Sequence, residues 1–207
     1  MAKVAHHYFS RENQYRVAGF TVNEAFAAGP TFCGLSVHPF ESLPATHPPT
    51  EYDLFIAVGP SKMNSAREEK FLEAKNLGYR LASFISSKAV CESPVGENSF
   101  IADFAVVQPF VKLGANNFVW EHAIVANESA IGSHCYLAPR ATLSSYSSLG
   151  NNCVLGTASV IKTRVAVAAY SLIGAACYVS RNTDAYSVYG TRHSAFLGPN
   201  SMKVNLS

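Results

Sequence analysis

A strict six-residue periodicity runs through the second half of the chain and constrains its fold more than any other feature. Stepping by six from Val95 meets an aliphatic residue at every step up to Val179, without one insertion. The residue four positions after each aliphatic is nearly always small, as at Ser99, Cys135 and Cys177. An amphipathic helix repeats its apolar positions near 3.6 residues and a strand near 2. The period of six instead predicts a left-handed parallel β-helix, a triangular coil with three short flat faces per turn.

Glycines support this register, because Gly96, Gly114, Gly132 and Gly150 recur at the length of one coil of three hexads. We expect five coils stacked at the strand spacing of about 4.8 Å, with the left-handed winding that is the known exception among β crossovers. The faces are rich in Ala, Ser and Val rather than in Lys and Glu. Flat, weakly charged faces favour closed symmetric association. Hexapeptide β-helices typically form trimers, so we predict a homotrimer.

The first 94 residues have a different texture, in which helical and strand-like segments alternate. We expect helices at 1–11 and 64–77 and strands at 16–22, 52–58 and 79–85, the second strand being a buried parallel one. This alternation predicts a small Rossmann-like α/β domain. Such domains normally open with a strand and a Gly-rich turn, and both are missing here. The predicted division is an α/β domain at 1–94, the β-helix at 95–190 and a C-terminal tail at 191–207.

Charge and hydropathy exclude several classes of protein. The net charge of +2 and the lack of a basic run give no reason to expect a nucleic-acid partner. No stretch resembles a signal peptide, and none approaches the roughly 20 apolar residues that span a bilayer. We therefore expect a cytoplasmic protein without a membrane span. The five cysteines form no CxxC pair, and three of them occupy the small inward position of the hexad, as reduced core cysteines would.

The chain resembles the bacterial hexapeptide-repeat sugar acyltransferases of the sialic acid O-acetyltransferase and bacillosamine N-acetyltransferase type. The resemblance covers nearly the whole chain: FIAVG at 55–59, a following helix with Arg67, LASFISSKAV at 81–90, and then the hexads. It implies a trimer that binds acetyl-CoA or another acyl-CoA between subunits, and an α/β domain that helps to bind a nucleotide-linked sugar.

The resemblance also assigns roles to residues. The family's catalytic His falls on Asn127, with the neighbouring Glu128 kept. Ser145, one coil later, stands where the family tends to have Gly, and its main-chain N–H would bond the thioester carbonyl. Gly174 and Ala175 match the coil along which the CoA arm lies.

The predicted sugar-nucleotide residues lie in the α/β domain. Gly59 ends the FIAVG segment, and the carboxyl ends of parallel strands are where ligands bind in open α/β sheets. Asn64 and Arg67 follow closely, and Arg is a natural partner for a diphosphate.

Acyl transfer to an amine requires that the amine lose a proton, and without the usual His three routes remain. Glu128 accepts the proton if partial burial raises its pKa, His122 in the preceding hexad reaches the same cleft, or the amine arrives neutral and Asn127 only orients it. A hydroxyl acceptor would need a base far more, so the sequence favours an N-acyltransferase. The alternatives are a sugar O-acetyltransferase and a catalytically silent trimer that serves as a binding or scaffold protein. We expect no metal, because the histidines are too far apart for the three-His zinc site of γ-class carbonic anhydrases.

Overall fold

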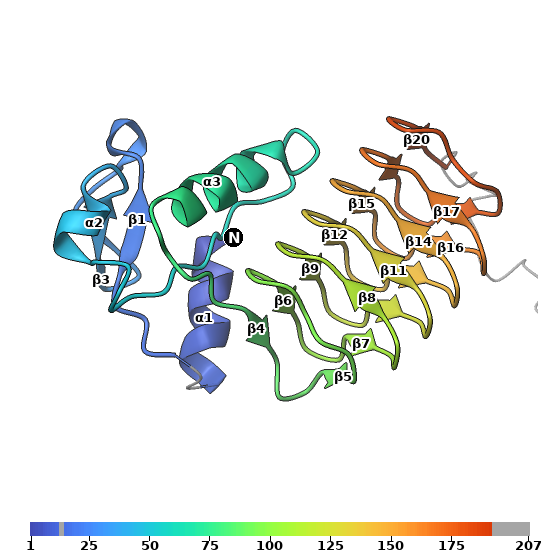
Figure 1. Ribbon diagram of the computed structural model, residues 1–207, viewed down its shortest axis with the longest axis horizontal. Helices are drawn as coiled ribbons and strands as arrows, with labels where there is room; N and C mark the ends of the chain where they lie inside the picture. Colours follow the sequence, from blue (N-terminus) through green and yellow to red (C-terminus); the bar gives the residue numbers. More distant parts are fainter. Residues whose placement is uncertain (13–14, 192–207) are drawn as a thin grey trace, which may run out of the picture.

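The computed structural model describes residues 1–12 and 15–191. An N-terminal part made of helices and short strands is followed by a long stack of β-coils (Figure 1). In the part of the chain that is described, no helix combines the length and the apolar character needed to cross a membrane.

The coils form a parallel β-helix, as the hexads predict. Each two-residue strand pairs in parallel with the strand one coil later, so that Ile124 lies beside Thr142 and Val125 beside Leu143. The second residue of most of these strands points into a continuous core, where Leu137, Leu143 and Leu155 are fully buried. The small inward positions are buried as well, including Cys135, Cys153 and Cys177, which are all free thiols.

Three sheets form the faces of this prism. The first sheet consists of β4 (Phe84–Ile85), β6 (Phe100–Ile101), β9 (Phe118–Val119), β12 (Tyr136–Leu137), β15 (Val154–Leu155), β18 (Leu172–Ile173) and β20 (Val188–Tyr189). The second sheet consists of β5 (Val90–Cys91), β7 (Val106–Val107), β10 (Ile124–Val125), β13 (Thr142–Leu143), β16 (Val160–Ile161) and β19 (Tyr178–Val179). The third sheet consists of β8 (Lys112–Leu113), β11 (Ala130–Ile131), β14 (Ser148–Leu149) and β17 (Ala166–Val167). Because β4 and β5 belong to these sheets, the pairing begins before Val95.

The chain turns at three corners, which we name after the sheet that follows each of them. At every sixth residue from Asn98 to Ala176 the backbone adopts a left-handed conformation with φ between 54° and 65°. The first corner carries Asn98, Asn116, His134, Asn152 and Tyr170; the second carries Phe104, His122, Arg140, Ala158 and Ala176; the third carries Phe110, Glu128, Tyr146 and Arg164. Side chains on one corner stack at the spacing of one coil.

Close approach between coils explains the recurring glycines. A Cβ at Gly150 would lie 2.5 Å from the backbone nitrogen of Ala169 in the next coil. A contact under 3 Å with backbone atoms cannot be relieved by moving a side chain, so only glycine fits this position without displacing the next coil.

Helix α1 (Ala2–Glu12) packs against the lower part of the first sheet. Its buried Tyr8 and Phe9 contact Phe84 at ring-centroid distances of 5.5 and 5.2 Å. Hydrogen bonds hold α1 at the adjoining second corner: the Tyr8 hydroxyl donates to Glu121 at 2.8 Å, and Arg11 donates to both carboxylate oxygens of Asp103. The outward residues of the first sheet therefore serve as the docking surface for the N-terminal part.

The remaining N-terminal elements form a small mixed sheet, a short 3-10 helix and two α-helices. They are β1 (Phe20–Val22), the 3-10 helix η1 (Glu24–Phe26), β2 (Thr31–Phe32), β3 (Leu35–Pro39), α2 (Leu43–Thr46) and α3 (Ser65–Asn76). The central strand β3 pairs in parallel with β1 and antiparallel with β2.

This arrangement does not confirm a Rossmann-like domain. The apolar run 52–58 forms no strand and makes one parallel bridge, between Leu54 and Leu81. The predicted strand at 79–85 is reduced to β4, which pairs with β6 of the β-helix. The physical reason is a contact with the β-helix: the N–H of Ile56 donates to the Asn98 side chain at 2.7 Å. At Ile56 the segment therefore bonds the first corner of the β-helix and not a neighbouring strand.

Candidate active site

The predicted catalytic residues Asn127 and Glu128 lie at the third corner, directly after β10. Glu128 occupies the left-handed corner position with φ 58°, and its side chain is exposed to solvent. Asn127 precedes it and is half-buried. The sharp corner thus turns the two neighbouring side chains into different surroundings.

Asn127 and Ser145 meet across adjacent coils, as the sequence predicts. The Ser145 hydroxyl donates to Asn127 Oδ1 at 2.7 Å. The main-chain N–H of Asn127 donates to Gln108 Oε1 at 2.9 Å, and its carbonyl accepts the N–H of Tyr146 at 3.2 Å. The bond from Ser145 holds the Asn127 side chain, and the other two bonds hold its main chain.

Gln108 is the member of this group that the sequence reasoning missed. Its side chain reaches from one coil to the next, to a residue 19 positions along the chain. Counting back one coil from the residue before Asn127 would have pointed to this position, because residues of successive coils stack.

His122 does not join this group within one chain. It lies at the second corner, where its ring stacks on Phe104 with 5.1 Å between ring centroids. Strand β10 separates it from Asn127, so the two residues stand at opposite edges of the second sheet. Gly174 and Ala175 lie at the second corner too, between β18 and β19. A single chain therefore divides the predicted acyl-CoA residues: Ser145 lies with Asn127 at the third corner, and Gly174 and Ala175 lie apart from them at the second.

The predicted sugar-nucleotide residues have a different placement. Gly59 is half-buried beside Met1. Asn64 and Arg67 are both fully buried where α3 meets the first corner of the β-helix. Asn64 begins α3 in a left-handed conformation, donates to the carbonyl of Cys153 at 3.3 Å and accepts a hydrogen bond from Arg67 at 3.0 Å.

The Arg67 guanidinium is directed into the β-helix. It donates to Asn116 Oδ1 and to the carbonyls of Asn116, His134 and Cys135 at 3.0 to 3.3 Å. The ring of Phe118 lies 4.4 Å from the guanidinium carbon. Burial lowers the pKa of Arg67 to about 10. With no exposed surface, the guanidinium is not open to a diphosphate, and the predicted role of Arg67 in binding one is not supported by this geometry.

A polar ladder continues along the first corner next to Arg67. Asn98 donates to Asn116 at 2.7 Å, and the Asn116 amide contacts His134 Nδ1 at 2.8 Å. On its other side, His134 Nε2 lies 3.6 Å from a carboxylate oxygen of Glu68 on α3. Burial lowers the pKa of His134, which therefore favours the neutral ring. We interpret this ladder as the joint that attaches α3 to the β-helix.

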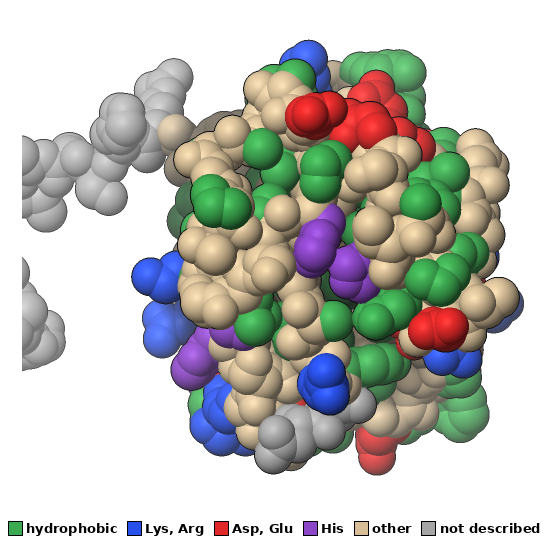
Figure 2. Space-filling view, turned by 90° about the vertical axis from the view of Figure 1, so that its left-hand side faces the viewer, with side chains coloured by type: hydrophobic (Ala, Val, Ile, Leu, Met, Phe, Trp, Pro, Cys, Tyr) green, Lys and Arg blue, Asp and Glu red, His purple; other side chains and the backbone are tan. Residues whose placement is uncertain are grey.

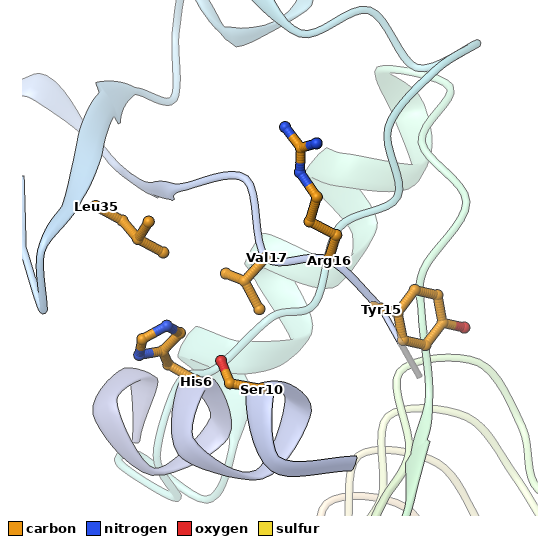
Figure 3. Close-up of a pocket in the computed structure, with 6 residues that line it drawn as sticks. All are labelled: His6, Ser10, Tyr15, Arg16, Val17 and Leu35. Carbon is orange, nitrogen blue, oxygen red and sulfur yellow. The ribbon is translucent and has the colours of Figure 1, made fainter. Parts of the chain in front are cut away.

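The N-terminal part also contains an open hollow of about 400 Å³ between α1 and the small sheet. Figure 3 shows His6 and Ser10 pointing up from α1 into it, with Val17 and Leu35 on the opposite side; Tyr15 and Arg16 complete the lining. Arg16 has no hydrogen bond or ion pair with any described residue.

Histidine side chains gather near the centre of the end of the molecule that Figure 2 shows. The rings of His38 and His47 lie 4.3 Å apart between centroids, and His47 also contacts Tyr52. Within residues 1–12 and 15–191, however, no three His, Cys, Asp or Glu side chains are grouped closely enough to hold a metal ion.

No family model and no curated protein sequence matches this chain, whereas several solved structures share its fold. A variant of perosamine N-acetyltransferase from Caulobacter crescentus, in which a histidine is replaced by asparagine, was solved with CoA and GDP-perosamine. It is 24% identical with a TM-score of 0.77, over 87% of this chain and 84% of that one.

Two further structures are similar over most of both chains. The acetyltransferase domain of PglB from Neisseria gonorrhoeae, in complex with acetyl coenzyme A, is 23% identical with a TM-score of 0.75, over 86% of each chain. WeeI from Acinetobacter baumannii is 18% identical with a TM-score of 0.75, over 91% of this chain and 89% of that one. At these identities the likeness establishes the fold of the chain, including the attachment of its N-terminal part.

Proposed function

We propose that the protein is an acyl-CoA-dependent N-acyltransferase, most simply an acetyltransferase, that acts on a nucleotide-linked amino sugar in surface-glycan synthesis. The observation that carries this proposal is the fold likeness to sugar N-acetyltransferases, which extends through both the N-terminal part and the β-helix. Two of those structures hold CoA or acetyl-CoA, and one also holds a nucleotide-linked amino sugar.

A trimer would complete the site that one chain leaves divided. Asn127 and Ser145 lie at the third corner, whereas Gly174, Ala175 and His122 lie at the second. Between these corners the second sheet presents exposed apolar side chains, including Ile124 and Tyr178. In the predicted homotrimer, the third corner of one subunit faces the second corner of its neighbour, with acyl-CoA between them.

An amine acceptor fits the residues at the third corner better than a hydroxyl acceptor. Asn127 replaces the usual His, and an amide does not accept a proton near neutral pH. Glu128 is the carboxylate beside it, exposed in the single chain. A neutral amine needs no base before it attacks a thioester, whereas a hydroxyl does.

The second candidate is the catalytically silent trimer, which the same replacement of His by Asn127 favours. This second hypothesis also predicts that acyl-CoA binds, but it predicts that no acceptor is acylated.

Release of free thiol from acetyl-CoA, with a panel of UDP-, dTDP- and GDP-linked 4-amino sugars, tests the proposal. Thiol release with one amino sugar, and none with the corresponding 4-hydroxy sugar, would support N-acylation. No release with any sugar or with longer acyl-CoAs would favour the silent trimer. Glu128→Gln tests whether Glu128 is the base, with Glu51→Gln at an exposed residue as its control. If thiol release falls in Glu128→Gln alone, Glu128 is the residue that accepts the proton of the amine. Unchanged rates would assign it to His122 or to an amine that arrives neutral.

A further inference from the structure

Every polar group of Asn127 except one has a partner. Its N–H donates to Gln108, its carbonyl accepts the N–H of Tyr146, and its Oδ1 accepts the hydroxyl of Ser145. The side-chain Nδ2 has no partner among residues 1–12 and 15–191. The Ser145 hydroxyl donates to Oδ1, so in this arrangement Nδ2 is the side-chain atom that remains available. Asn127 therefore presents a hydrogen-bond donor at this corner.

Ser145 presents a second donor in the neighbouring coil. Its hydroxyl is used by Asn127, and its carbonyl accepts the N–H of Arg164 at 3.3 Å. The main-chain N–H of Ser145 has no partner in the described part of the chain. Two unpartnered donors thus occur on residues that contact each other at 2.7 Å, and both residues are half-buried.

We propose that Asn127 Nδ2 is a second donor of the oxyanion hole for acyl transfer, beside the main-chain N–H of Ser145 that the resemblance already directs to the thioester carbonyl. The inference rests on the proposed function and adds to it a role for Asn127 as a donor to the acyl oxygen. This role differs from that of a base, and also from that of an acceptor that orients the amine. Fixed donors in a half-buried site need no rearrangement when negative charge develops, which is the source of their effect on the transition state.

The reaction balances without a protein base. The lone pair of the neutral amine attacks the thioester carbon, forming the C–N bond, and the C=O π electrons move to the oxygen that the two donors hold. Collapse restores C=O and breaks the C–S bond, so that the CoA thiolate leaves. The proton released from the nitrogen neutralises the thiolate through solvent, giving the amide and the free thiol.

Gln108 acts in this scheme as a positioning residue. Its side chain bonds the main chain of Asn127 and leaves the Asn127 amide to Ser145. The Ser145 hydroxyl is likewise a positioning group, because it holds Oδ1 and so directs Nδ2 outward.

A binding experiment that needs no sugar tests the donor pair. Calorimetry compares acetyl-CoA with S-ethyl-CoA, a thioether that lacks the carbonyl oxygen but is otherwise of nearly the same shape. We expect the wild-type protein to bind acetyl-CoA about five-fold more tightly, as about one net hydrogen bond supplies. Asn127→Asp has nearly the same shape and no side-chain N–H, and its carboxylate repels the carbonyl oxygen, so this preference should disappear or reverse even though the Ser145 N–H remains.

Asn151→Asp is the matched control, because Asn151 occupies the same position of its hexad at the first corner, where its Oδ1 accepts the N–H of Ser133. It should keep the wild-type preference. Equal binding of the two ligands by wild-type protein, or an unchanged preference in Asn127→Asp, would overturn the proposal.

Turnover supplies the second arm, once an acceptor sugar has been found. We expect kcat to fall by about 10² to 10³ in both Asn127→Asp and Asn127→Ala, with little change in the KM for acetyl-CoA. Activity in Asn127→Asp that equals or exceeds the wild-type level would show that Oδ1 is the functional atom, and would refute the donor role. A carbonyl preference without any turnover would support the donor pair and count against the proposed function, so the two failures are distinguishable.

Discussion

Replacing Arg67 by methionine tests whether this arginine clamps α3 onto the β-helix. Removing the guanidinium leaves three oxygens without their only partner among residues 1–12 and 15–191: Asn64 Oδ1 and the carbonyls of Asn116 and His134. Each buried unsatisfied acceptor costs at least about 1 kcal/mol, and the contact with Phe118 adds about 1 kcal/mol. Relief of the buried charge offsets part of this sum, so we expect a net loss of about 3 kcal/mol.

Thermal unfolding followed by circular dichroism, at one fixed protein concentration, measures this loss. For a chain of this length, about 3 kcal/mol corresponds to a fall in Tm of about 6 to 12 °C. Arg80→Met is the control, because the Arg80 side chain is 79% exposed and its pairing with Asp53 lies at the surface; its Tm should barely change. The contrary outcome is an Arg67→Met protein that has the same Tm as the wild-type protein and yet no longer binds a nucleotide-linked sugar. That result would refute the clamp and would assign Arg67 to sugar-nucleotide binding.

Three further predictions concern stability. Because the pKa of His134 is lowered in the folded chain, the unfolded chain takes up a proton near pH 6.5 and the folded chain only at lower pH. The free energy of unfolding should therefore fall as the pH drops below about 6.5. His134→Asn should flatten this pH dependence, which denaturant titrations at several pH values measure. Gly150→Ala should cost at least about 2 kcal/mol because its Cβ meets backbone, whereas Gly29→Ala, which meets no atom within 4 Å, should leave Tm unchanged. Phe100 lies in the core between α1 and the first sheet, so Phe100→Ala should cost about 3 to 5 kcal/mol of stability and make α1 sensitive to proteolysis. Phe26→Ala, at a side chain that is 77% exposed, should do neither. Equal stability of the two members of either pair would contradict the packing described above.

The β-helix was predictable because its signal repeats. One aliphatic and one small residue in every hexad specify which side chains point inward, and the pairing of Ile124 with Thr142 follows directly from the coil length. The left-handed sense of the winding and the homotrimer stay predictions. The N-terminal part was not predictable in the same way, because several of its segments bond the β-helix as well as each other. Nothing in the run 52–58 signals that Ile56 will bond Asn98.

The candidate site was predictable only where residues of one coil position stack. The meeting of Asn127 with Ser145 follows from their separation by one coil, and the structure confirms their contact. The burial of Arg67 had no sequence signal, since an arginine on a helix is usually exposed. The separation of His122 from Asn127 depends on the position of the corners, which the hexads alone do not mark as left-handed turns.

The uninterrupted pairing of coils also limits how the length of this protein can change. Because each strand is held in register by the coils before and after it, adding or losing one residue inside the stack would turn every later inward side chain outward. Insertions and deletions are tolerated there only in whole coils, so related chains should differ in length by multiples of one coil. The described residues depart from this spacing only at the two ends of the stack, where the coils are shorter: Phe84 pairs with Phe100 and Val90 with Val106 at one end, and Ile173 with Tyr189 at the other. No described strand of the β-helix stacks beyond either end, so a change of length there leaves the rest of the prism undisturbed.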